Sequence, residues 1–175
     1  MILSIRRKTR DNSVKLIITD IESFDIKVNG EYKVINPHGP IHYCIGCFGC
    51  WVKTPGKCVI HDGYEDTGVA MGNCDEIIII SRCYYGSVSP FVKKVQDRAI
   101  SYIQADFVMY DGEMHHKQRY SNRPKLSVYF YGENITEEEK ATAAKIIKAN
   151  VDNYDGIMGE VRFYESFDEL RGVCL

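Results

Sequence analysis

Short hydrophobic runs, separated by polar stretches, dominate the pattern of the chain. Residues 14–19 (VKLIIT), 76–81 (EIIIIS) and 125–131 (KLSVYFY) are rich in β-branched or aromatic side chains and are bounded by polar or turn-forming residues. Runs of this length and composition are typical of strands that are buried on both faces of a sheet. Residues 31–34 and 160–164 predict two further strands.

Helical periodicity follows the isoleucine-rich strand. Ser89 and Pro90 predict the N-cap and the first turn of a helix. Hydrophobic residues then recur at helical spacing, namely Phe91, Val92, Val95, Ala99, Ile100 and Ile103. A shorter and poorly amphipathic helix is expected over residues 66–73, before that strand.

A second long helix follows residues 125–131. Thr136 and Glu139 form a capping-box pattern, which predicts a helix that runs to about Asn150. Strands that alternate with helices imply right-handed crossovers and a parallel sheet. The chain is therefore expected to form an α/β domain with a central parallel sheet, and ligands are expected beyond the carboxyl ends of its strands.

Two segments fall outside this alternation. Residues 106–122 predict no regular element and read as a polar excursion that carries His115 and His116. Adjacent histidines on an extended segment point to opposite faces, so we expect both to be exposed rather than to share a metal ion. Residues 1–13 are interpreted as an N-terminal extension of a single domain that spans residues 1–175.

Composition and charge narrow the function. The chain has 22 Lys and Arg against 24 Asp and Glu, a formal net charge of -2, which disfavours nucleic acid as a partner. No apolar run approaches the roughly 20 residues that span a bilayer, and the first ten residues lack the apolar stretch of a signal peptide. We therefore expect a cytoplasmic protein with no membrane partner, whose seven cysteines are reduced.

Four of these cysteines form the densest chemical signal. Cys44, Cys47, Cys50 and Cys58 are separated by gaps of two, two and seven residues. Four thiolates suit a cubane iron–sulfur cluster or a zinc ion, and glycines in the short gaps let the backbone wrap around a cluster. The cluster is favoured over zinc, because zinc ligand pairs usually lie on separated knuckles. Alternatively, the cysteines are small apolar residues that line a tight loop.

A second signal follows the isoleucine-rich strand directly. Tyr84, Tyr85, Gly86 and Ser87 form a loop at the carboxyl end of a central strand. Two aromatic side chains for stacking and a glycine for close backbone approach suit a flat ring such as a flavin. The same residues also suit a plain strand-to-helix turn in which the tyrosines pack on a neighbour.

The segments CIGCFGCW, TPGKCVIHD and CDEIIIISRCYYGSVSPFVKKVQDR together resemble the NAD(P)H-dependent FMN reductases and iron–sulfur flavoproteins. This resemblance implies a flavodoxin-like three-layer sandwich. It implies that residues 84–87 contact the isoalloxazine ring of FMN, and that Cys44, Cys47, Cys50 and Cys58 ligate a 4Fe-4S cluster. It also implies a homodimer.

The chain departs from that family in its first strand–loop–helix unit. Members of the family grip the FMN phosphate with a Gly/Ser/Thr-rich loop and the amino end of a long helix. Here Asp20 and Glu22 follow the first strand, and their carboxylates would repel a phosphate. An alternative register makes residues 1–5 the first strand, so that the polar and basic residues up to Ser13 surround the phosphate.

These signals together predict a flavin-dependent NAD(P)H oxidoreductase or electron-transfer flavoprotein, with a small molecule or a protein as electron acceptor. The flavin would do the chemistry, so no catalytic side chain is assigned. A flavodoxin-like binding or scaffold protein that has lost FMN is the first alternative. A thiol or zinc protein that uses the cysteine loop alone is the second.

Overall fold

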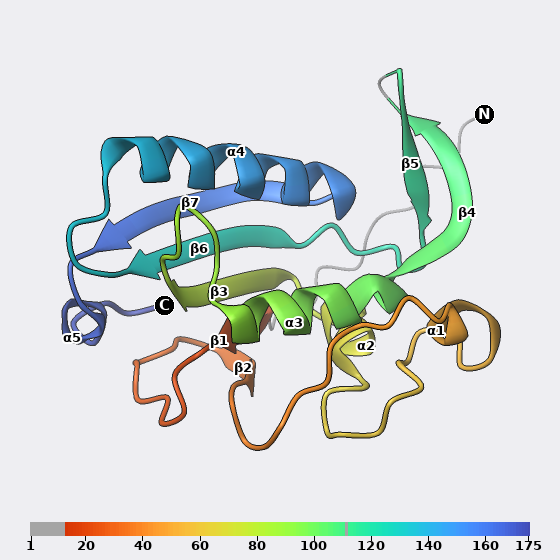
Figure 1. Cartoon of the computed structure of the whole chain (residues 1–175), viewed down its shortest axis with the longest axis horizontal. Helices are drawn as coiled ribbons and strands as arrows, with labels where there is room; N and C mark the ends of the chain where they lie inside the picture. The colour runs from red at the N-terminus through yellow and green to blue at the C-terminus, as the bar shows by residue number, and fades with distance from the viewer. Residues whose placement is uncertain (1–12, 111) are drawn as a thin grey trace.

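Five parallel strands form the centre of the molecule (Figure 1). The structure is a computed structural model that describes residues 13–110 and 112–175. The strands lie in the order β2-β1-β3-β6-β7, and every neighbouring pair is parallel. Their bounds are β1 Val14–Thr19, β2 Glu31–Ile35, β3 Glu76–Arg82, β6 Lys125–Tyr131 and β7 Ile157–Tyr164. This flavodoxin-like arrangement confirms the predicted α/β fold.

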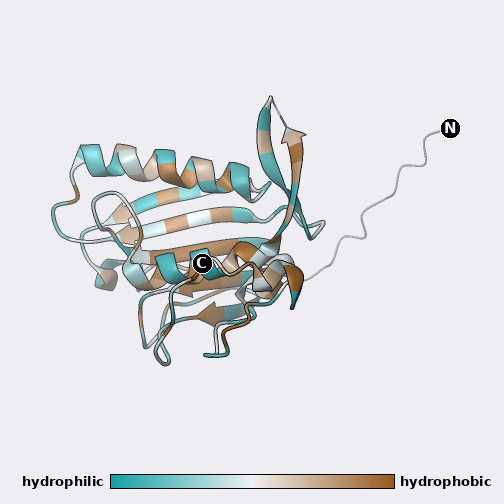
Figure 2. Cartoon of the chain, turned by 45° about the vertical axis from the view of Figure 1, so that its right-hand side comes forward, coloured by the Kyte–Doolittle hydropathy of each residue, from teal (hydrophilic) through white to brown (hydrophobic). Residues whose placement is uncertain are grey.

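Three helices cover one face of the sheet. They are α2 (Thr67–Gly72), α3 (Pro90–Arg98) and α4 (Glu137–Asn153), and their apolar side chains form one core cluster with the strands. The capping box at Thr136 and the N-cap at Ser89 are present as predicted. Figure 2 shows that the middle of β3 is hydrophobic, whereas hydrophilic and hydrophobic residues alternate along α4.

The opposite face has a thinner cover. Ile17, Ile78 and Ile80 pack there against Ile26 and against the chain end near Leu170. The short helix α5 (Phe167–Leu170) and the loop of residues 20–30 supply this layer. No helix intervenes between β1 and β2 in the described part of the chain, so the place of the usual phosphate-binding helix is taken by a loop.

The helix α3 ends earlier than its sequence periodicity predicts. After Arg98 the chain forms a 3-10 turn, η1 (Ala99–Tyr102), and Ile103 begins a strand. The indole Nε1 of Trp51 donates hydrogen bonds to the carbonyl oxygens of Ile100 (3.2 Å) and Ile103 (3.0 Å). A side chain about fifty residues away therefore binds the carbonyls that a longer helix would have used.

Residues 106–122 contain regular structure, so the prediction of no regular element is wrong. The strands β4 (Ile103–Tyr110) and β5 (Glu113–Gln118) pair antiparallel as a hairpin that projects from the body of the molecule (Figure 1). The prediction failed because the hairpin buries few of its apolar side chains and so lacks the pattern of strands packed on a core. Phe107, Met109 and Met114 all stay exposed. Within the described ranges, no helix is long and apolar enough to cross a membrane.

Candidate functional site

The cysteine loop, residues 44–58, lies between β2 and α2, with the one-turn helix α1 (Gly49–Val52) at its centre. Gly46 (φ 62°) and Phe48 (φ 57°) both adopt left-handed backbone conformations. These two residues turn the chain sharply between Cys44, Cys47 and Cys50. The glycine accommodates this at little cost, whereas Phe48 does not, so the turn at Phe48 is held by its surroundings.

The four cysteines predicted as ligands all line one cavity. Cys44 and Cys47 are exposed, Cys58 is half-buried and Cys50 is buried. Burial raises the pKa of the Cys50 thiol, and the nearby thiols of Cys58, Cys44 and Cys47 raise it further. Across residues 13–110 and 112–175, however, no three His, Cys, Asp or Glu side chains are close enough together to hold a metal ion. The structure thus gathers the thiols around one space without closing them on a centre.

Aromatic rings anchor the loop to the hairpin. The Trp51 ring lies 5.4 Å from that of Phe48 and 5.2 Å from that of His116, between ring centroids. The Phe107 ring packs on His116, with 4.5 Å between the ring centroids. His115 and His116 are both half-buried, so the expected exposure of this pair is wrong. His116 packs between Trp51 and Phe107, and His115 lies against Tyr110 and Glu113 of the same hairpin.

A buried ion pair lies beneath the cysteine loop. The Arg98 side chain is fully buried; its Nη1 donates to the Asp62 carboxylate and its Nη2 to the carbonyl of Ile60 (2.9 Å). Burial alone would raise the pKa of Asp62, but hydrogen bonds from Arg98 and from the backbone N–H groups of His42 and Tyr64 hold it below its usual value. The third nitrogen of the guanidinium, Nε, is buried and has no hydrogen-bond partner in the described part of the chain.

Arg98 and its neighbour Asp97 point in different directions. Asp97 forms an ion pair with Lys93 on the surface of α3. Arg98 turns inward to Asp62 and lies near Cys58. Burial would lower the pKa of the guanidinium, but Asp62 and Cys58 raise it above its usual value. A contact between residues 62 and 98 has no local sequence signal, so only the fold could reveal it.

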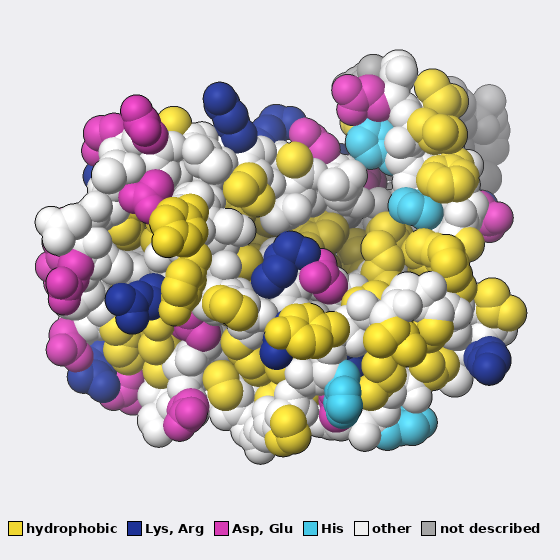
Figure 3. Space-filling view, in the orientation of Figure 1, with side chains coloured by type: hydrophobic (Ala, Val, Ile, Leu, Met, Phe, Trp, Pro, Cys, Tyr) yellow, Lys and Arg dark blue, Asp and Glu magenta, His cyan; other side chains and the backbone are white. Residues whose placement is uncertain are grey.

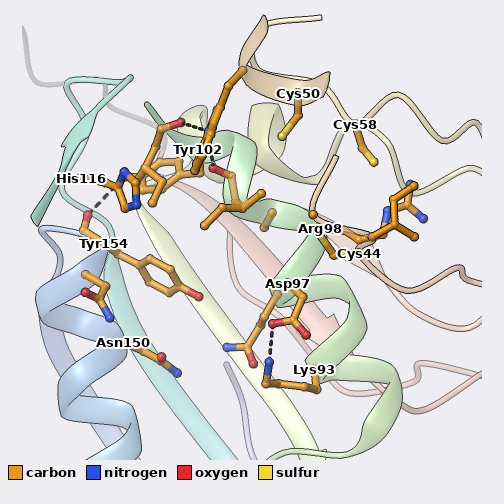
Figure 4. Close-up of a pocket in the computed structure, with 18 of the residues that line it drawn as sticks. Cys44, Cys50, Cys58, Lys93, Asp97, Arg98, Tyr102, His116, Asn150 and Tyr154 are labelled. Carbon is orange, nitrogen blue, oxygen red and sulfur yellow. Dashed lines mark hydrogen bonds and ion pairs between the residues drawn. The ribbon is translucent and has the colours of Figure 1, made fainter. Parts of the chain in front are cut away.

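The cavity is a groove of about 700 Å³ between α3, α4, the hairpin and the cysteine loop. Figure 3 shows hydrophobic side chains gathered around this hollow, and Figure 4 shows the labelled side chains within it. Cys50, Cys58 and Arg98 lie at one end, whereas Asn150 and Tyr154 approach from α4 at the other (Figure 4). Its floor includes Val88, Phe130 and Ile147.

The loop predicted to hold a flavin ring is a tight turn at the carboxyl end of β3. The N–H of Tyr84 donates to the carbonyl of Ser87 (2.9 Å), and the N–H of Ser87 donates to that of Tyr84 (2.8 Å). Tyr85, with φ 51°, leaves 88% of its surface exposed. Gly86 has φ 79°, and a Cβ there would meet the carbonyl oxygen of Glu139 at 2.6 Å, so this glycine makes room for α4.

The FMN phosphate does not fit the described end of β1. The Asp20 carboxylate accepts hydrogen bonds from the backbone N–H of Arg82 (3.0 Å) and from the hydroxyl of Tyr131 (2.9 Å). A negative side chain thus occupies the position and uses the backbone donor that a phosphate would need. The alternative register over residues 1–5, with its basic residues up to position 10, lies outside the described residues.

The cysteine loop and the Tyr84–Ser87 turn lie at opposite ends of the sheet. In Figure 1 the arrowheads of β6 and β7 mark the carboxyl edge, whereas α1 lies at the amino edge near the hairpin. Of the turn residues, Ser87 lines the same groove as the four cysteines, whereas Tyr84, Tyr85 and Gly86 do not, so the two sequence signals meet only at Ser87. No protein-family model matches the chain, and no similar sequence is found among curated proteins. The fold defines an α/β protein of flavodoxin-like architecture, and no family is identified.

Proposed function

We propose that this protein is an electron-transfer oxidoreductase whose cysteine loop holds a 4Fe-4S cluster. The observation that carries the proposal is that Cys44, Cys47, Cys50 and Cys58 line one cavity, although no three of them lie close enough together in the described residues to hold a metal ion. Beside them lies a fully buried arginine, Arg98, whose Nε has no partner among the described residues. Four thiolates are the usual ligand set of such a cluster.

The surroundings of the thiols suit a negatively charged group. The positive charge of Arg98 is fixed by Asp62 and Ile60, and Nε retains one donor for an acceptor in the cavity. Hydrogen bonds and nearby charge tune the potential of a cluster. A bound cluster would accept and release one electron at a time.

The surface around the loop suits an electron-transfer partner. Ile45, Phe48 and Val52 are each more than half exposed on the cysteine loop, next to the exposed thiols of Cys44 and Cys47. Apolar surface at a redox centre favours brief docking of a protein or a small-molecule acceptor. Homodimerisation stays part of the proposal, and sedimentation of the purified protein tests it.

A flavin-dependent NAD(P)H oxidoreductase is the second candidate function. It is favoured by the exposed Tyr84 and Tyr85 at the carboxyl edge, where flat ligands of parallel α/β sheets usually bind. Against it, Asp20 occupies the phosphate position. We therefore derive no reaction step through FMN.

An absorbance spectrum from 300 to 700 nm on anaerobically purified protein distinguishes these functions. A broad band near 400 nm that bleaches with dithionite supports the cluster. A structured flavin band that survives removal of excess FMN supports the second candidate, and a colourless protein with zinc supports a zinc protein. A colourless protein without metal would overturn both redox proposals in favour of a binding protein.

A further inference from the structure

The end of the cavity between α3 and α4 has its own polar groups, separate from the cysteines. Tyr154 and Asn150 approach from α4, and Gln96 lines the same space from α3 (Figure 4 labels the α4 pair). Burial raises the pKa of Tyr154 to about 12, against the smaller opposing effect of the Gln96 amide. The hydroxyl therefore stays neutral and available as a donor at physiological pH.

One donor at this end is unsatisfied. Among the described residues, the buried amide nitrogen of Gln96 has no hydrogen-bond partner, although it lies beside the Tyr154 hydroxyl. A buried polar group without a partner costs about 1–3 kcal/mol, so a ligand that supplies an acceptor recovers that free energy. The donor lies in a space lined largely by apolar groups such as Ile100, Phe130 and Ile147.

The charges near this end cancel. Lys93 and Asp97, the charged side chains of α3 that line the groove away from the cysteines, form an ion pair with each other. A charged ligand would enter an apolar groove without a counter-ion of its own and would lose its hydration. The site therefore favours a neutral ligand.

From these features we propose that the α3–α4 end of the cavity binds an uncharged aromatic ligand of about two rings that carries a carbonyl oxygen. The oxygen accepts hydrogen bonds from Gln96 Nε2 and the Tyr154 hydroxyl, and the rings pack on Ile100, Phe130 and Ile147. The whole groove, of which this end is a part, has a volume of about 700 Å³, within the range that small-molecule sites occupy. This inference does not depend on the proposed cluster, because the binding groups lie on α3, on η1, on β6 and on or directly after α4.

Two isosteric probes test the proposal on the protein as purified. Benzophenone carries the carbonyl, and 1,1-diphenylethylene replaces it with a carbon that accepts no hydrogen bond. Ligand-observed NMR gives both dissociation constants. Trp51, the single tryptophan of the chain, lines the cavity and reports occupancy through its fluorescence.

We expect benzophenone to bind about tenfold more tightly than 1,1-diphenylethylene, which is the worth of one to two hydrogen bonds. Gln96→Leu with Tyr154→Phe should remove this preference, while Tyr32→Phe on β2 should preserve it. Circular dichroism confirms that each variant is folded. Equal affinity for the two probes in the unmodified protein, no binding of either, or a preference that survives the double substitution would overturn the proposal. Loss of the cluster alone leaves these outcomes unchanged.

Discussion

At the scale of single residues, the pair Arg98 and Asp62 ties the cysteine loop to the end of α3. Arg98 is fully buried, and Asp62 also accepts the backbone N–H groups of His42 and Tyr64. A buried ion pair adds little net stability, but removal of one partner leaves an uncompensated charge. The pair therefore acts mainly to fix where the loop lies.

Removal of Asp62 alone should cost more stability than the whole ion pair contributes. We expect Asp62→Ala to lower the free energy of unfolding by about 3 kcal/mol, because Arg98 would lose its buried partner. Asp97→Ala is the matched control: it breaks the exposed ion pair with Lys93 on the same helix and should cost less than about 1 kcal/mol. Urea unfolding measures both. Equal losses would mean that Arg98 is not buried as described.

The same pair makes stability depend on acid. The pKa of Asp62 is lower in the folded state than its usual value, so its stabilising effect is complete above about pH 4, the ordinary pKa of an aspartate. The effect is lost as the pH falls through the lower folded pKa. Unfolding curves from pH 6 to pH 2 should show a steeper loss for the unmodified protein than for the double variant Asp62→Ala, Arg98→Met. Parallel curves would refute this role.

Substitution of Gly86 tests whether the Tyr84–Ser87 turn requires a glycine at this position. A Cβ at Gly86 would meet Glu139, and its φ of 79° strains any other residue. We expect Gly86→Ala to destabilise the protein by about 2 kcal/mol or more, whereas Gly112→Ala, with φ 81° and open space, should cost about 1 kcal/mol from the backbone alone. Thermal unfolding compares the two. If the costs are equal, the contact with α4 is not close.

At the scale of elements, the sequence predicts correctly those helix ends that depend on residues close together in the chain. Ser89 and Thr136 are read correctly as N-caps because capping involves residues within three positions of one another. The end of α3 and the hairpin were missed, because Trp51 binds the carbonyls after α3 and the hairpin packs on the same ring. Contacts of that span leave no periodicity in the chain.

The capping box of α4 should contribute measurably. Thr136 accepts the N–H of Glu139 (3.2 Å), and the Glu139 carboxylate accepts the N–H of Thr136 (2.9 Å). We expect Thr136→Ala to cost about 1 kcal/mol. Thr142→Ala makes the same chemical change at an exposed position inside α4 and should be nearly neutral. A comparable loss from both substitutions, measured by chemical unfolding, would argue against the cap.

At the scale of the whole molecule, alternation of strands and helices was enough to predict the parallel sheet, since crossover rules leave few arrangements. The relative position of the two sequence signals was not predictable. Resemblance to flavoproteins joins cysteines and tyrosines in one centre, but the loop after β2 reaches the amino edge, whereas the turn after β3 starts from the carboxyl edge. The sequence already indicates that no phosphate-binding helix follows β1. In the structure the Asp20 carboxylate lies there and accepts the backbone N–H of Arg82.

Iron and sulfide analysis of anaerobically purified or reconstituted protein tests the proposed iron–sulfur cluster of the cysteine loop. Cys47→Ser removes one proposed ligand, and Cys174→Ser changes an exposed cysteine outside the loop. We expect about four irons and four sulfides per chain in the unmodified protein and in Cys174→Ser, with a clear loss in Cys47→Ser. Iron content that is negligible in all three proteins, or equal in all three, would contradict it.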